Sequence, residues 1–189
     1  FPDWKFRRLS RTINRSLTAQ CNYLAEVAEQ YKYGRNNGLK YRVIRRAAHN
    51  NDAEVASLIS TLATEPDFDP TQKTLAFEFL CLNHTLLSYI AALGAHREKI
   101  EDQEVLTLLD ITVENIQRSL LKDEAPDLNA QNMLDTIRQR LSSNNKDDQK
   151  ALIVLQQLSL MLSILNQLSR LKQSLSHDRD DKATELASL

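Results

Sequence analysis

The stretch ALIVLQQLSLMLSILNQLS, residues 151–169, decides between two folds, because it runs for 19 positions without a charged residue. An apolar segment of that length could cross a bilayer as a helix. Polar residues, however, recur at spacings of three and four: Gln156, Ser159, Ser163, Asn166 and Arg170. Leucines form the opposite face: Leu155, Leu158, Leu162, Leu165 and Leu168. This two-sided pattern predicts an amphipathic helix buried in a bundle, and any membrane-spanning segment would lie outside this sequence.

The rest of the chain also predicts helices, since only 3 Gly and 4 Pro leave little turn chemistry for a sheet. Asp69 and Pro70 form the clearest helix start, while Asp102 and Asn129 are expected to cap two later helices. The expected helices cover about 4–33, 39–63, 70–99, 103–120, 130–141 and 146–175. Short connections favour antiparallel neighbours. We therefore predict an all-α, single antiparallel bundle of about six helices over residues 1–175, with the third and sixth helices central and a polar, flexible tail at 176–189.

Charge is distributed unevenly along the chain, although the formal net charge is only -1. Residues 1–50 hold eleven Lys or Arg and three Asp or Glu, whereas residues 51–189 hold thirteen and twenty-two. Such asymmetry indicates either electrostatic matching between early and late helices or a basic end that faces an anionic surface.

The basic start, residues 1–15, combines cations with aromatic rings, a mixture suited to the interface between membrane and water. Its candidate membrane-proximal residues are Trp4, Lys5, Arg7, Arg8, Arg11 and Arg15. The same run could neutralise nucleic-acid phosphates, or it could simply be a solvated helix face. The overall charge near zero argues against nucleic acid, because such domains usually keep a positive surface.

A second candidate set, expected to form a polar internal network or contact site, comes from two predicted helices. It comprises His49, Asp52, Asn83, His84, His96 and Arg97. Asp52 follows His49 by three positions, so the carboxylate could orient the imidazole or the pair could help hold a metal. Two ligands at one spacing are a weak metal signal, and structural pairing is favoured. Gly94, inside a predicted helix, is expected to permit close helix contact.

No catalytic motif is visible in the sequence. Cys81 and His84 share a spacing that could suit a nucleophilic thiol, but such chemistry needs an exposed, activated cysteine. Both cysteines, Cys21 and Cys81, are expected to be reduced and buried. The chain contains no Walker-type glycine loop, Gly-x-Ser-x-Gly elbow or His-Glu-x-x-His helix. We expect no enzyme activity, no metal and no cofactor.

Several polar clusters carry a resemblance to a known family. They are Asn37-Gly38-Leu39, Tyr41-Arg42, Arg45-Arg46, Ala48-His49-Asn50, Asp52-Ala53-Glu54, Cys81-Leu82-Asn83-His84-Thr85, Ser88-Tyr89-Ile90 and Ala92-Leu93-Gly94-Ala95-His96-Arg97. In this order they resemble the C-terminal soluble region of YccS/YhfK-type proteins, which belong to the fusaric-acid-resistance-like (FUSC) and aromatic-acid-exporter group of bacterial inner-membrane proteins. The resemblance is densest over residues 4–100.

The resemblance implies a cytoplasmic domain of a polytopic inner-membrane transporter or efflux protein. The expected partners are the membrane-spanning part of its own full-length chain, a second copy of the domain and anionic lipid headgroups. The alternative is a free-standing helical regulatory module that binds nucleic acid or an acidic partner through its basic first helix.

Overall fold

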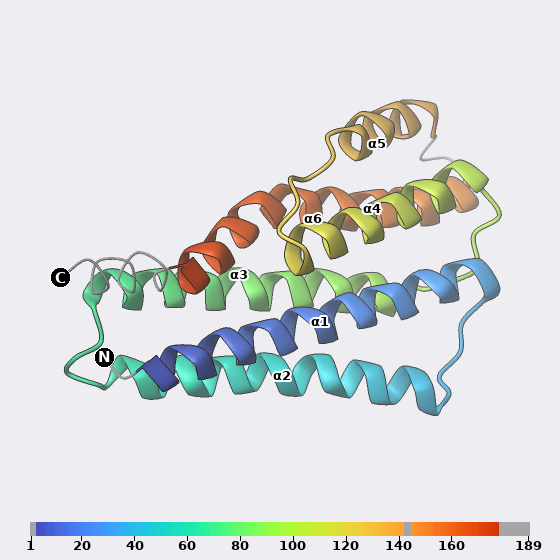
Figure 1. Ribbon diagram of the computed structural model, residues 1–189. Helices are drawn as coiled ribbons and strands as arrows, with labels where there is room; N and C mark the ends of the chain where they lie inside the picture. Colours follow the sequence, from blue (N-terminus) through green and yellow to red (C-terminus); the bar gives the residue numbers. More distant parts are fainter. Residues whose placement is uncertain (1–2, 142–144, 178–189) are drawn as a thin grey trace.

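A computed structural model describes residues 3–141 and 145–177 of the chain. The described residues form only helices, joined by short connections (Figure 1). The helices are α1 (Asp3–Tyr33), α2 (Leu39–Ala63), α3 (Pro70–Ala95), α4 (Gln103–Leu121), α5 (Asn129–Arg140) and α6 (Lys146–His177). The predicted all-α bundle is confirmed. The last helix runs two residues beyond the predicted end at 175, and the predicted tail lies otherwise outside the described residues.

Two of the three predicted caps form. Asp69 accepts a hydrogen bond from the Thr71 amide at 2.9 Å, and Asp102 accepts one from the Glu104 amide at 3.0 Å. Both carboxylates satisfy amides that a helix start leaves without an intrahelical partner. The prediction for Asn129 is wrong, because Asn129 is the first helical residue and its amide donates to Asp127 Oδ1 at 2.9 Å.

The third helix ends at Ala95 rather than near residue 99. The Arg97 side chain donates to the Gly94 carbonyl in the last turn of α3. Three residues later, the Ile100 amide donates to the Tyr31 carbonyl of α1 at 2.9 Å. These two contacts draw the chain away from the helical path.

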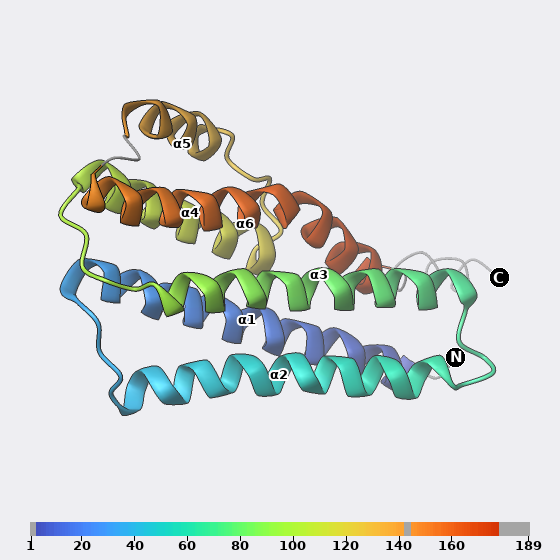
Figure 2. The ribbon, with the colours of Figure 1, turned by 180° about the vertical axis from the view of Figure 1, so that it is seen from behind.

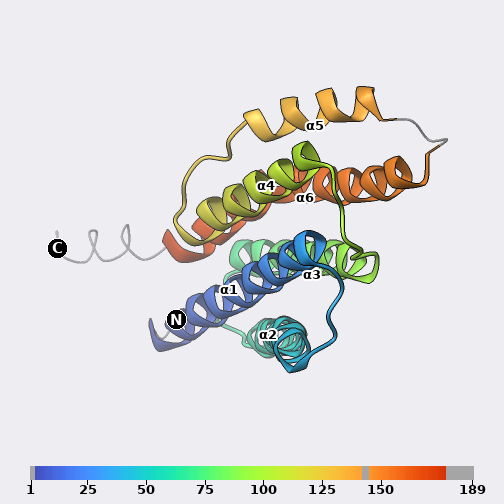
Figure 3. The same cartoon turned by 90° about the vertical axis from the view of Figure 1, so that its right-hand side faces the viewer.

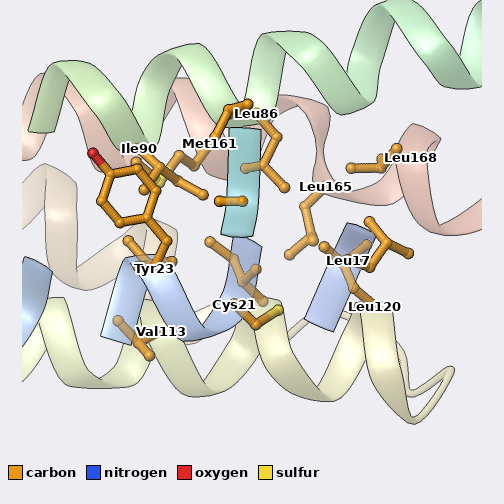
Figure 4. Packing of buried hydrophobic residues seen from close by; sticks show 14 of the residues in the cluster. Leu17, Cys21, Tyr23, Leu86, Ile90, Val113, Leu120, Met161, Leu165 and Leu168 are labelled. Carbon is orange, nitrogen blue, oxygen red and sulfur yellow. The ribbon is translucent and has the colours of Figure 1, made fainter. Parts of the chain in front are cut away.

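The helices stack in successive layers, with α2 on one side, α1 and α3 next, then α4 and α6, and α5 outermost (Figures 2 and 3). α1 packs against α2, α3, α4 and α6, so it is as central as the predicted pair of α3 and α6. Apolar side chains from four helices meet in the interior (Figure 4): Leu17, Cys21, Tyr23, Leu86, Ile90, Val113, Leu120, Met161, Leu165 and Leu168.

Two helices are long and apolar enough, by length and composition alone, to cross a membrane: α3 and the 146–176 part of α6. Core helices of a bundle meet the same criterion, so it is weak evidence for a span. Along α6 the buried leucines Leu158, Leu165 and Leu168 alternate with exposed Gln156 and Asn166. That alternation matches the amphipathic pattern of the sequence, and α3 packs against α6.

Candidate functional site

A buried group of polar side chains joins α1, α2 and α3 midway along the bundle. This central cluster consists of Ser16, Gln20, Asp52, Asn83 and His84. Asn83 Nδ2 donates to Asp52 Oδ1 at 2.8 Å and to Ser16 Oγ at 3.0 Å. Gln20 Nε2 donates to the side-chain oxygen and to the backbone oxygen of Asn83, both at 3.0 Å. One asparagine with no exposed surface therefore ties three helices together.

The central cluster reaches solvent through His84. The other carboxylate oxygen of Asp52, Oδ2, lies 2.8 Å from His84 Nδ1. The Asp52 side chain is 10% exposed, whereas that of His84 is 68% exposed. A single carboxylate thus connects a buried amide to an imidazole at the surface, and this arrangement orients the ring.

His49 lies beside this cluster without a hydrogen bond to Asp52, so the structure pairs Asp52 with His84 instead. The His49 ring faces the Tyr23 ring, with the centroids 6.3 Å apart. Burial and, after it, the neighbouring Arg45 lower the pKa of His49, while Asp52 opposes the shift. The neutral imidazole is therefore favoured in the folded chain.

Arg97 forms a second buried group at the end of α3. This loop-end cluster consists of Gln30, Asn37, Tyr41, Gly94 and Arg97. Arg97, which is only 3% exposed, donates from Nε to Gln30 Oε1 at 2.6 Å. Its other nitrogens donate to the Gly94 carbonyl and to Asn37 Oδ1, and the guanidinium lies 3.9 Å from the centre of the Tyr41 ring. One buried cation thus fixes the α1–α2 connection to the end of α3.

His96 belongs to neither cluster. It is the C-cap residue of α3, its amide donates to the Leu93 carbonyl at 3.3 Å, and it is exposed. The six residues proposed as one polar set are therefore separated into two clusters and two histidines, His49 and His96, outside them.

Gly94 makes the close helix contact that the sequence predicts. A Cβ at this position would lie 3.2 Å from the hydroxyls of Tyr23 and Tyr41 and 3.2 Å from Val27 Cγ2. The missing side chain lets α3 approach α1 and α2, and the Gly94 carbonyl accepts from Arg97 at the same place.

The sequence interpretation missed two of the five residues of the central cluster and three of the five residues of the loop-end cluster. The missed members are Ser16, Gln20, Gln30, Asn37 and Tyr41. A signal existed for two of them: Ser16 and Gln20 lie four positions apart, next to the inward-facing Leu17 and Cys21. Polar residues inside an apolar helix face must find partners when they are buried.

The basic start forms one wall of an open groove between α1 and α2. The groove has a volume of about 610 Å³, and Arg7, Arg11 and Arg15 line its α1 side. Trp4 is 57% exposed, and Arg8 is exposed as well. Lys5 instead pairs with Glu65 at 2.8 Å and lies over the Trp4 ring. Arg8, Arg11, Arg15 and Trp4 are thus exposed to a partner, while Lys5 is engaged within the bundle.

The two thiols lie in different surroundings. Cys21 is buried, and burial raises the pKa of its thiol to about 12 despite the opposing charge of Lys172. Cys81 is exposed, so the prediction that it is buried is wrong. α3 is apolar on most sides, and its sequence does not show which side packs inward. The described residues contain no group of three or more His, Cys, Asp or Glu side chains placed to hold a metal.

Comparison with known proteins extends the resemblance over almost the whole chain. The chain is 41% identical over 177 residues to the inner membrane protein YccS of Escherichia coli (strain K12), a match covering 93% of this chain and 25% of YccS. It corresponds to a YccS-type region. The family resemblance from the sequence is thereby confirmed at the level of YccS.

Two further relatives match about half of this YccS-type region. An uncharacterized protein of Haemophilus influenzae is 35% identical over 102 residues, 54% of this chain and 14% of that protein. An uncharacterized protein, ORF2, of Neisseria gonorrhoeae is 31% identical over 109 residues, 57% of this chain and 26% of that protein. The chain thus spans about a quarter or less of each relative. No protein-family model and no solved structure matches it.

Proposed function

We propose that this chain is a cytoplasmic domain of an inner-membrane transport protein, and that it acts through assembly, gating or partner contact rather than through catalysis. The observation that carries the proposal is the match of 93% of the chain to a quarter of an inner membrane protein. Because the chain resembles the FUSC and aromatic-acid-exporter group, we infer that the activity of the whole protein is export. Transport itself would require the membrane-spanning part of the full-length chain.

The polar clusters support a role in which α1, α2 and α3 move together as one rigid body. Asp52 and Asn83 hold three helices together, and Arg97 fixes two connections at one end of the bundle. Most of their polar atoms bond to one another and to the backbone, as in a structural clamp. A domain built in this way moves as one body, so a force or a partner acting on α1 is transmitted to α2 and α3.

The test uses the full-length protein in its own cells and compares three versions. These are the wild type, a version lacking residues 1–177, and one carrying Asn83→Leu. We expect all three in the inner-membrane fraction. In the wild type and in Asn83→Leu, the domain should be cleaved by protease in inverted vesicles and protected in spheroplasts. We also expect both altered versions to export aromatic acids less well than the wild type, with Asn83→Leu the milder change.

Two results would contradict the proposal. The first is protease cleavage of the domain in intact spheroplasts, which would place it on the other side of the membrane. The second is unchanged export by the deleted version. A matched control is Thr112→Val, which alters a buried polar residue of α4 outside both clusters and should leave export unchanged.

A further inference from the structure

Beyond its first residue, Asp3, α1 carries only positive charge over its first five turns. Residues 4–22 contain five Lys or Arg and no Asp or Glu. Spacings of three and four place Trp4, Arg7, Arg11 and Arg15 on one face of the helix. Arg11 and Arg15 form no ion pair with any residue in the described ranges, so their charge is not neutralised within the bundle.

The facing side of the groove is apolar. Val43, Ile44 and Ala47 of α2 line it, and Val43 is 56% exposed. The helices run antiparallel, because Lys5 pairs with Glu65 at one end while the Tyr23 hydroxyl lies 3.4 Å from that of Tyr41 near the other. The groove therefore has a cationic part near the start of α1 and an apolar part near the start of α2.

The α4 segment on the other side of α1 carries the opposite charge, while α5 and α6 hold six Lys or Arg against three Asp or Glu. Residues 103–128, which form α4 and its connection to α5, hold six Asp or Glu against two Lys or Arg. This segment and α2 lie on opposite sides of the stack (Figure 3). Such a charge separation orients the domain in the field of an anionic surface, which attracts one side and repels the other.

We propose that the α1–α2 face, defined by Trp4, Arg7, Arg11, Arg15 and Val43, lies against the anionic surface of a lipid bilayer. The three arginines contact headgroup phosphates, and the Trp4 ring and Val43 sit at the level of the interface. This inference rests on the proposed function, which puts the domain beside the inner membrane. It adds an orientation: the domain lies along the membrane on one face.

The test mixes the chain with vesicles of phosphatidylcholine, with or without phosphatidylglycerol, and measures co-sedimentation. Binding should require phosphatidylglycerol and weaken with added salt. Trp4 is the single tryptophan of the chain, so its emission should shift to shorter wavelength on binding. Each basic residue near such a surface contributes about fivefold to partitioning, so replacing Arg7, Arg11 and Arg15 by Gln should lower it on the order of a hundredfold.

A matched triple variant tests whether vesicle binding depends on the α1–α2 face or only on the total charge of the chain. Lys122→Gln, Arg138→Gln and Arg170→Gln remove the same charge from exposed positions of the α4–α6 side. This variant should bind within about twofold to threefold of the wild type, because those positions face away from the membrane. Helix content measured by circular dichroism should be unchanged in both triple variants.

A second pair of variants tests the apolar part. Val43→Asp should weaken binding to phosphatidylglycerol vesicles about tenfold or more, since it puts a negative charge on the docked face. Leu128→Asp makes the same change at a residue that is 78% exposed in the α4–α5 connection, and it should have little effect.

Several outcomes would overturn the inference. These are equal losses in the two triple variants, equal binding to vesicles without phosphatidylglycerol, or binding of duplex DNA through the same arginines without binding to vesicles. If vesicle binding fails while the full-length protein shows the expected topology and export, only the docking face is wrong. If vesicles bind but protease reaches the domain in spheroplasts, the proposed function is wrong and the lipid-binding face remains.

Discussion

Two parts of the bundle bury polar side chains in different ways. We call them the α1–α3 layer, which consists of α1, α2 and α3, and the α4–α6 layer, which consists of α4, α5 and α6. In α1–α3, side chains bond to side chains of other segments, as in Asn83 with Asp52 and Arg97 with Gln30. In α4–α6, buried donors mostly reach backbone carbonyls: Ser169 Oγ donates to the Ser119 oxygen at 3.2 Å, and Lys172 Nζ donates to the Leu120 oxygen at 2.7 Å as well as to Asp123 Oδ1 at 3.0 Å. Both layers share one apolar interior, so the difference lies in the polar contacts alone.

The two layers differ in how strictly their polar contacts require particular residues. A backbone carbonyl accepts from any donor that reaches it, whereas a pair of side chains requires two particular residues in one register. The α1–α3 layer therefore depends on residue identity at its polar positions, and the α4–α6 layer depends mainly on apolar packing and on helix ends. The four predictions below test this contrast by the free energy of unfolding, measured by urea denaturation.

Arg97→Ala should have the largest effect. It removes a buried cation together with its hydrogen bonds to Gln30 Oε1, Asn37 Oδ1 and the Gly94 carbonyl, although the Asn36 amide still donates to Gln30 Oε1. We expect the free energy of unfolding to fall by about 3 kcal/mol. The control Arg138→Ala changes an exposed arginine of α5 and should cost less than about 0.5 kcal/mol. Similar losses for both variants would contradict the contrast.

Asn83→Leu should have the second-largest effect and should lower the free energy of unfolding by about 2 kcal/mol. The substitution keeps a similar side-chain volume but leaves Asp52 Oδ1 and Ser16 Oγ without the donor that Asn83 supplies, while Gln20 Nε2 keeps the backbone oxygen of residue 83. The loss should shrink when Asp52 is also changed to Asn, because the two residues share one network. Strictly additive losses in this double-mutant cycle would show that the hydrogen bond does not couple them.

Thr112→Val should raise the free energy of unfolding instead of lowering it. Thr112 of α4 has no exposed surface, and its hydroxyl has no hydrogen-bond partner within residues 3–141 and 145–177. Replacing that hydroxyl by a methyl group removes an unsatisfied polar atom at nearly constant volume, and we expect a gain of up to about 1 kcal/mol. A loss as large as that of Asn83→Leu would mean that α4 also depends on specific polar residues.

The smallest effect is expected at His49, where the free energy of unfolding should depend on pH. Because its pKa is lowered in the folded chain, the unfolded chain takes up this proton at higher pH. Stability should therefore fall as the pH decreases through the ordinary imidazole value of 6.5. His49→Gln should reduce the fall between about pH 8 and about pH 5. The control His96→Gln, at an exposed histidine outside both clusters, should follow the wild type.

Local signals allowed much of this fold to be predicted. Asp69, Pro70 and Asp102 mark helix starts through contacts within a few residues, and the polar stripe of residues 151–170 identifies the outer face of α6. The partners of Asn83 and Arg97 could not be predicted in this way. They depend on how far one helix is shifted along another, and that shift is set by side chains more than 30 residues apart.

The position of α1 has a consequence for biosynthesis. α1 is made before the other five described helices, yet its inner face is covered partly by α4 and α6, which follow Leu17 and Tyr23 by roughly 80 to 160 residues. At about 5–20 residues per second, translation leaves Leu17 and Tyr23 without those neighbours for roughly five to thirty seconds. During that interval the ribosome displays an incomplete hairpin of α1 and α2 with an uncovered apolar face. A chaperone that binds such faces would meet this chain early and release it only when α6 has emerged.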